Sequence, residues 1–446
     1  MTSYRNILKL VWPLALGMIN NAVMQFVDRA YLAHDSLEAL EAALPAGMLM
    51  WIFGGFFQGV VGYSSVFVGQ YHGAGDENGC RAVCRVALVL AAVFGVLSLP
   101  LVPFGEWILG QTASSPRLFE HEVGYFRILM AGSVSVYGQM AAASYFTGKG
   151  STRIVFWVNL LGNVLNIALD PILIFGWWGC PRLGISGAAY ATVASMAVQC
   201  LILVFAARHV FKRPTDSSHS IIRVFDYSII SSLLRFGVPS GLHTILNMLS
   251  FTIFVFVTGG VGEFELAVSN ACFTVNYLLI APMEGFALGA STLVAQAIGR
   301  KDVDGAVRDA HRTIFLGVAL VAGLSALVLA CARPILGIFA AQAGAAVADF
   351  HALGFRLMLL MAAWQLFDAA DVVLSGAQKG AGDTKFVMGW MLFCAFAVWL
   401  PLVFVIRQFH NTMPALWSTM VVYVIIICVG SVVRWRRGRW KAIKVI

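Results

Sequence analysis

The chain has 446 residues, of which 59% are hydrophobic and only 12% are charged, whereas a soluble domain carries about a quarter charged residues. This composition excludes a water-soluble fold and favours a chain built largely of membrane helices. The net charge of +8 could suggest a nucleic-acid partner, but the basic residues gather at the termini and in alternate loops. We therefore attribute the charge to membrane topology and expect no nucleic acid to bind.

Twelve apolar stretches are long enough to cross a membrane, since about 20 apolar residues span the hydrocarbon core. They lie near 7–32, 43–69, 82–104, 122–147, 153–178, 184–208, 229–259, 266–298, 310–331, 351–377, 386–406 and 413–433. The positive-inside rule predicts an inner-membrane protein with both termini in the cytoplasm. We expect the basic tail RWRRGRWKAIK to lie against anionic lipid.

The first stretch carries polar side chains that a retained membrane helix has to bury. Asn21, Gln25 and Asp28 follow one another at helical spacing, which places them on one face. A charged side chain at membrane depth costs at least about 2.5–3.5 kcal/mol on insertion scales. Asp28 therefore needs a specific partner.

The fifth stretch carries a longer polar face, made of Asn159, Asn163, Asn166 and Asp170. Lipid cannot satisfy such groups, so we expect the two polar faces to meet each other or to line a watery cavity. Two carboxylates with carboxamide oxygens suit a hard cation such as Na⁺, and two neighbouring carboxylates equally suit a shared proton. Polar packing between helices would explain the asparagines but not two aspartates.

Acidic residues also fall within stretches of the second half. Glu284 lies in the eighth stretch, and Gln365, Asp368 and Asp371 share a face of the tenth. No lysine is expected at membrane depth to neutralise them, so the candidate partners are protons, metal cations or a cationic substrate. Asp371 has an alternative role as a residue that packs helices together.

The second half repeats the first at an offset of 226 residues. The matched pairs are Pro13 and Pro239, Asn21 and Asn247, Gly59 and Gly285, Gln70 and Gln296, Gly73 and Gly299, Asp76 and Asp302, and Gly79 and Gly305. The repeat predicts two six-helix lobes, 1–208 and 229–446, joined by a cytoplasmic linker at 209–228. Parallel repeats of this kind are one way to build a transporter with alternating access.

Four segments together resemble the multidrug and toxic compound extrusion (MATE) family. They are WPLALGMINNAVMQFVDRAYLA, NVLNIALDPILIFG, GISGAAYATVAS and FDAADVVLSGAQKGAGDTKF, in the first, fifth, sixth and tenth stretches. The resemblance covers nearly the whole chain. It implies an exporter in which Asp28, Asn166, Asp170 and Thr192 form a cation site, with H⁺ or Na⁺ as the coupling ion and no other cofactor.

The same resemblance assigns Asp368 to the acid position of the carboxy-terminal lobe. Where NorM-like members carry a seventh-helix glutamate, this chain has Asn247. This departure puts a second sodium site in doubt. Together with Asp170 it favours the DinF-like branch of the family.

These patterns lead to the hypothesis of an antiporter that exports amphipathic, mostly cationic small molecules and acts as a monomer. The main alternative is a flippase for a lipid or a lipid-linked oligosaccharide, for which a more basic cavity would be expected. An enzyme is disfavoured because the sequence has no HExxH, GxSxG or P-loop motif. A channel is disfavoured because there is no filter-like segment.

Overall fold

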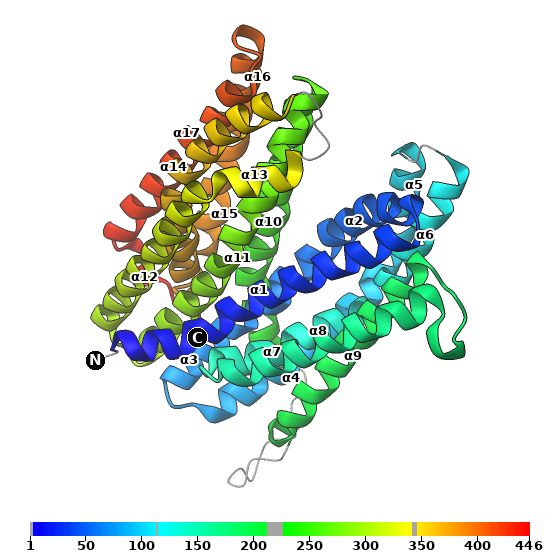
Figure 1. Ribbon diagram of the computed structural model, residues 1–446. Helices are drawn as coiled ribbons and strands as arrows, with labels where there is room; N and C mark the ends of the chain where they lie inside the picture. The colour runs from blue at the N-terminus through cyan, green and yellow to red at the C-terminus, as the bar shows by residue number, and fades with distance from the viewer. Residues whose placement is uncertain (1–2, 113–114, 212–225, 341–345) are drawn as a thin grey trace. The chain divides into compact units, whose positions relative to one another are not determined.

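The computed structural model describes residues 3–112, 115–211, 226–340 and 346–446, which are almost entirely helical (Figure 1). The helices of the first half are α1 (Tyr4–Asp35), α2 (Leu37–Gly62), α3 (Ser64–Gly73), α4 (Glu77–Ser98), α5 (Val102–Thr112), α6 (Pro116–Ala131), α7 (Ser133–Gly148), α8 (Thr152–Phe175) and α9 (Ile185–Ala206). Those of the second half are α10 (Tyr227–Gly259), α11 (Glu263–Gly299), α12 (Val303–Ala330), α13 (Ala332–Ala340), α14 (Val347–Gly380), α15 (Thr384–Leu392), α16 (Leu400–Phe409) and α17 (Met413–Arg436). A π-helical segment, Phe393–Trp399, joins α15 to α16.

The prediction of an all-α membrane protein is confirmed. Among the described residues, eleven helical segments are long and apolar enough to cross a membrane. The remaining predicted stretch, 122–147, falls on α6 and α7, which have 16 residues each and meet at Gly132. A Cβ atom at Gly132 would lie 2.2 Å from the side chain of Val193 in α9. The glycine at this break therefore lets α9 approach closely.

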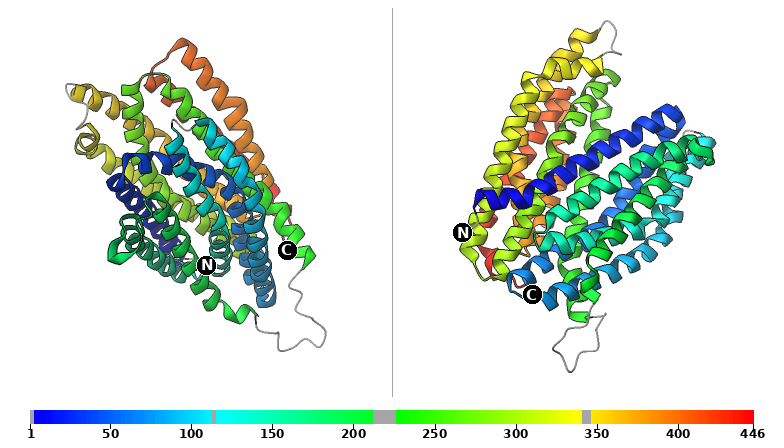
Figure 2. Two further views of the ribbon diagram at one scale, coloured as in Figure 1. Left: turned by 90° about the vertical axis from the view of Figure 1, so that its right-hand side faces the viewer. Right: turned by 60° about the horizontal axis from the view of Figure 1, so that its bottom comes forward.

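The chain divides into two compact units. Unit 1 consists of residues 1–15, 246–294 and 302–444, and unit 2 of residues 16–245, 295–301 and 445–446. The division falls inside α1, α10 and α11, and the right-hand view of Figure 2 shows α1, in dark blue, as one uninterrupted helix. Most of the predicted linker at 209–228 lies outside the described residues, so the division into lobes at that point stays a prediction.

The internal repeat appears in the structure as matching pairs of close backbone contacts. In unit 2, a Cβ atom at Gly73 would lie 2.1 Å from the carbonyl oxygen of Gln296, and one at Gly299 would lie 2.0 Å from that of Gln70. The offset of 226 residues converts one contact into the other. The repeat predicted from the sequence is therefore confirmed in three dimensions.

The repeat also relates two places where helices cross at a glycine. In unit 2, a Cβ atom at Gly59 of α2 would lie 2.6 Å from Cα of Gly241 in α10. In unit 1, a Cβ atom at Gly285 of α11 would lie 2.4 Å from the backbone nitrogen of Ala15 in α1. Each half thus uses one glycine to bring two helix backbones into contact, as small residues do in membrane bundles.

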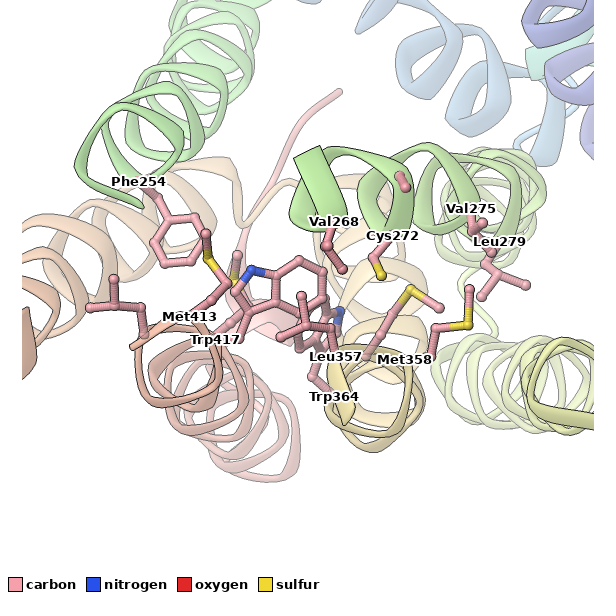
Figure 3. Close-up of a cluster of buried hydrophobic side chains, with 14 of the residues drawn as sticks. Phe254, Val268, Cys272, Val275, Leu279, Leu357, Met358, Trp364, Met413 and Trp417 are labelled. Carbon is pink, nitrogen blue, oxygen red and sulfur yellow. The ribbon is translucent and has the colours of Figure 1, made fainter. Parts of the chain in front are cut away.

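Unit 1 has an apolar core between α11, α14 and α17 (Figure 3). Trp417 of α17 is fully buried in it, with its ring 5.1 Å from that of Trp364. The indole N–H of Trp417 donates to the hydroxyl of Ser269 at 3.0 Å, which satisfies the one polar group that this side chain buries. The core fixes the spacing of α11 and α14, the helices that carry Glu284 and Asp368.

Candidate functional site

Two acidic side chains of unit 2 lie together, as their polar faces predict. The Asp28 carboxyl of α1 lies within hydrogen-bonding reach of the Asp170 carboxyl of α8. Asp170 is completely buried, with 0% of its surface exposed, and Asp28 is half-buried. Two carboxylates this close repel each other unless a proton or a cation is shared between them. The arrangement therefore requires a positive partner.

The end of α8 that carries Asp170 is held by the loop that follows it. The Leu183 N–H in this loop donates to the Leu173 carbonyl in the last turns of α8 at 3.0 Å. Arg182 of the same loop forms an ion pair with Asp35, the last residue of α1, at 2.7 Å. One loop therefore holds the ends of both helices that carry the acid pair.

The polar faces of α1 and α8 also meet nearer the middle of the two helices. Asn163 Nδ2 donates to Asn21 Oδ1 at 2.9 Å, which fixes the register of the two helices. Asn166 is completely buried, and neither of its side-chain polar atoms has a partner among the described residues. Gln25 and Thr192 are half-buried, and within the described ranges neither donates a hydrogen bond to the acid pair.

The site has an excess of acceptor atoms. Oδ1 of Asp28, both carboxyl oxygens of Asp170 and Oδ1 of Asn166 are buried and unpartnered among the residues described. Carboxylate and carbonyl oxygens are the ligands that hard cations prefer. The same pair of carboxyl groups can instead hold a proton. The residues present therefore fit either ion.

Two side chains of α6 that the sequence does not single out lie in this unit. Tyr125 lies within electrostatic range of both members of the acid pair, and its ring packs against the cluster around Leu32 and Ile185. Glu122, one turn earlier, is 1% exposed, and its Oε2 has no partner among the described residues. Glu122 begins the predicted stretch 122–147, so an inspection of the ends of the stretches could have found it. Nothing in the sequence marks Tyr125.

The acids of the second half gather in unit 1. Asp368 of α14 lies within electrostatic range of Asp371 and of Glu284 on α11, and Asp371 lies close to Ser431 of α17 with its own Oδ1 unpartnered among the described residues. Lys379, in the last turn of α14, acts electrostatically on Glu284 and Asp371. Lys379 lies two residues beyond the predicted stretch 351–377, near the end of α14 at Gly380, so a lysine acts on these acids from the helix end.

The polar face of α14 is shared between two neighbouring helices. Gln365 is completely buried and donates through Nε2 to Asn276 Oδ1 of α11. Asp371, by contrast, lies close to Ser431 of α17. Asn247 of α10 has an exposed side chain, and its carbonyl oxygen accepts a hydrogen bond from the Ser250 hydroxyl at 2.9 Å.

The chain matches the MatE family model twice, over residues 13–172 and 239–405. The two matches begin at Pro13 and Pro239, which the repeat pairs with each other. Together they include most of both halves of the chain.

The chain is also similar to proteins named for multidrug resistance. The probable multidrug resistance protein YoeA of Bacillus subtilis is 25% identical over 404 residues, which cover 89% of this chain and 85% of that protein. The multidrug resistance protein PmpM of Pseudomonas aeruginosa is 27% identical over 403 residues, covering 89% and 82%. A solved outward-facing multidrug resistance MATE family transporter of the MOP superfamily superposes with a TM-score of 0.87 at 21% identity, covering 98% of this chain and 96% of that one. This last likeness establishes the fold.

Proposed function

Because the chain belongs to the MatE family, we propose that it is a secondary active multidrug exporter. It moves organic, mostly cationic compounds outward in exchange for inward H⁺ or Na⁺. The names of its relatives support drug export. The single observation that carries the exchange mechanism is the pair formed by the buried Asp170 and the half-buried Asp28, with unpartnered oxygens on both.

In this proposal the coupling ion binds Asp28 and Asp170, with Asn166 and Thr192 as further ligands. A supporting polar stripe of Asn21, Gln25 and Asn163 holds α1 against α8. Ion binding removes the repulsion between the two carboxylates, so the ion stabilises the state in which they are closest. Exchange follows if ion and substrate bind the two states of the transporter unequally, with a coupling free energy of typically about 1–3 kcal/mol.

The acids of unit 1 have a separate role in the proposal. Asp368 and Glu284 attract the cationic substrate, and Lys379 compensates part of the negative charge at Glu284 and Asp371. The proximity of Asp371 to Ser431 of the neighbouring helix α17 supports a packing role for Asp371. Asn247 provides no carboxylate, so the coupling ion binds in the amino-terminal lobe, which accords with the DinF-like branch.

The proposal includes the predicted organisation of the chain. Two lobes, 1–208 and 229–446, alternate access across the inner membrane, with both termini in the cytoplasm and the basic tail on anionic lipid. The transporter works as a monomer, with small molecules and membrane lipid as its partners. It uses no cofactor beyond the coupling ion.

The ion pair of Arg127 with Glu106 favours export of cations over the flippase alternative. A flippase has to accommodate phosphate, and the basic residues within the predicted helices that could do so are Arg127 and Arg356. Arg127 instead forms a two-point ion pair with Glu106, at 2.5 Å and 2.8 Å. Its charge is therefore already compensated.

Efflux from proteoliposomes tests the proposed function. A cationic dye is loaded inside, and a proton gradient and then a sodium gradient, each directed inward, are imposed. We expect one of them to drive efflux by the wild type, and Asp28→Asn to abolish it without loss of folded protein. Asp304→Asn, the same change at an exposed position of α12, serves as the control. Equal efflux by Asp28→Asn, or efflux independent of both gradients, would overturn the proposal.

A further inference from the structure

A second polar cluster lies in unit 2 where α7, α8 and α9 meet. Gln139 Nε2 donates to Asn159 Oδ1 at 3.0 Å and to Gln199 Oε1 at 3.5 Å. Gln199 is 2% exposed, and its Nε2, which carries two N–H donors, has no partner among the described residues. A buried donor without an acceptor is unfavourable. These three residues are called the carboxamide cluster. Its buried member Gln199 needs an acceptor that the described residues do not supply.

The space for Gln199 is created by a glycine. A Cβ atom at Gly162 of α8 would lie 2.1 Å from Nε2 and 2.3 Å from Cδ of Gln199. Any larger residue at position 162 would push the carboxamide away from α8. Gly162 thus admits a polar group to a position between two helices where close apolar packing would otherwise be favoured.

The carboxamide cluster continues the polar face that leads to the acid pair. Asn159 precedes Asp170 by eleven residues, which is about three helical turns and about 16 Å along α8. Asn163 and Asn166 lie between them on the same face, and both polar atoms of the Asn166 side chain are unpartnered among the residues described. Buried polar groups without protein partners are the places where proteins hold internal water.

We propose that the carboxamide cluster is an internal water site through which the coupling ion leaves the acid pair. Water bound to Gln139, Asn159 and Gln199 extends the polar face of α8 into a release route toward Thr152, where α8 begins about 10 Å beyond Asn159. In the proposed topology this end of α8 is cytoplasmic. Water is required because lipid cannot solvate a proton or Na⁺ during its release. The inference rests on the proposed function.

Gln199→Leu tests the route because it removes the unpartnered donor at similar side-chain volume. In proteoliposomes we expect dye efflux to fall about tenfold, the size of one lost buried hydrogen bond. The affinity for the coupling ion, read from the ion-dependent rise in melting temperature, is expected to stay unchanged. Gln199→Asn keeps a carboxamide and is expected to recover most of the rate. Gln111→Leu, the same change at an exposed position of α5, is the control.

Three outcomes would overturn the water site. The first is wild-type efflux by Gln199→Leu, and the second is a loss of ion affinity as large as that of Asp28→Asn, since Gln199 would then belong to the ion site itself. The third is an equal loss in the asparagine and leucine variants, which would indicate packing. If Gln199→Leu does not fold, efflux and ion affinity are measured on Gln139→Leu instead, with the same expected and overturning results. Unimpaired efflux by Asp28→Asn would instead overturn the proposed function.

Discussion

Gly285 allows a direct test of how closely α1 and α11 approach within unit 1. The change Gly285→Ala adds a Cβ atom that would lie 2.4 Å from Ala15 N, 2.5 Å from Ala15 Cα and 2.7 Å from Leu14 C. All three are backbone atoms, which cannot rotate away as a side chain can. Since ordinary contacts begin at 3.4 Å, the two helices have to separate by about 1 Å.

The expected cost follows from that separation. Overpacking of this kind costs about 1–3 kcal/mol, while alanine in place of a helical glycine returns about 0.5–1 kcal/mol. We therefore expect a net destabilisation of about 1–2 kcal/mol. For a unit of this size each kcal/mol lowers the melting temperature by about 2–4 °C, so the variant is expected to melt several degrees below the wild type.

Thermal unfolding of the purified protein in detergent measures this effect. Gly323→Ala is the matched control, because a Cβ atom at this helical position of α12 would meet nothing within 4 Å. Gly59→Ala, at the repeat-related crossing in unit 2, is expected to lower the melting temperature by a similar amount. If Gly285→Ala melted at the same temperature as the control, the close approach of the two backbones would be refuted.

Two further variants test single interactions. Asp170→Asn is expected to weaken ion binding by about a hundredfold or more, because a unit charge about 4 Å away contributes about 4 kcal/mol at an effective dielectric constant of 20 and the carboxamide restores only part of it. The ion affinity is measured from the melting temperature at increasing ion concentration, with Asp304→Asn as the control. An unchanged affinity in Asp170→Asn would contradict the ion site at Asp28 and Asp170. Arg434→Gln removes both bonds to Asp383, at 2.7 Å and 2.9 Å, and leaves a carboxylate with 4% side-chain exposure unpaired. This variant is expected to lose about 3 kcal/mol of stability. The control Arg436→Gln, at an exposed position, is expected to melt at the wild-type temperature. Equal melting temperatures of the two variants would contradict a structural role for the ion pair of Arg434 and Asp383.

Polar groups at helical spacing could be interpreted from the sequence because a membrane offers them so few partners. The faces of Asn21 and Asp28 on α1 and of Asn163 and Asp170 on α8 had to meet polar atoms, and in the structure they meet each other. The register of the repeat could also be predicted from the sequence. In the structure the repeat-related Asp76 and Asp302 make the same contact: each accepts a backbone N–H at the start of its helix, from Gly79 at 2.8 Å and from Gly305 at 2.7 Å.

Contacts between residues that stand alone on different helices could not be predicted in this way. Gln139 is the only carboxamide of α7 and Gln199 the only carboxamide of α9. One carboxamide on each helix does not show which residue of a neighbouring helix it contacts. The position of Tyr125 near the acid pair could not be predicted either, because no pattern in the sequence of α6 links it to α1 or α8. The contact of Lys379 with the acids could not be predicted either, because Lys379 follows the predicted stretch 351–377 by two residues, whereas α14 continues to Gly380.

The crowding of negative oxygens at Asp28 and Asp170 also makes the stability of the purified protein depend on the cations in its buffer. A ligand that binds only the folded chain stabilises it by about 2.7 kcal/mol at a hundredfold excess over its dissociation constant. The choice of purification buffer therefore becomes an experiment in itself. A scan of melting temperature against sodium concentration, repeated at several pH values, shows which positive species the folded chain retains, before any substrate is known.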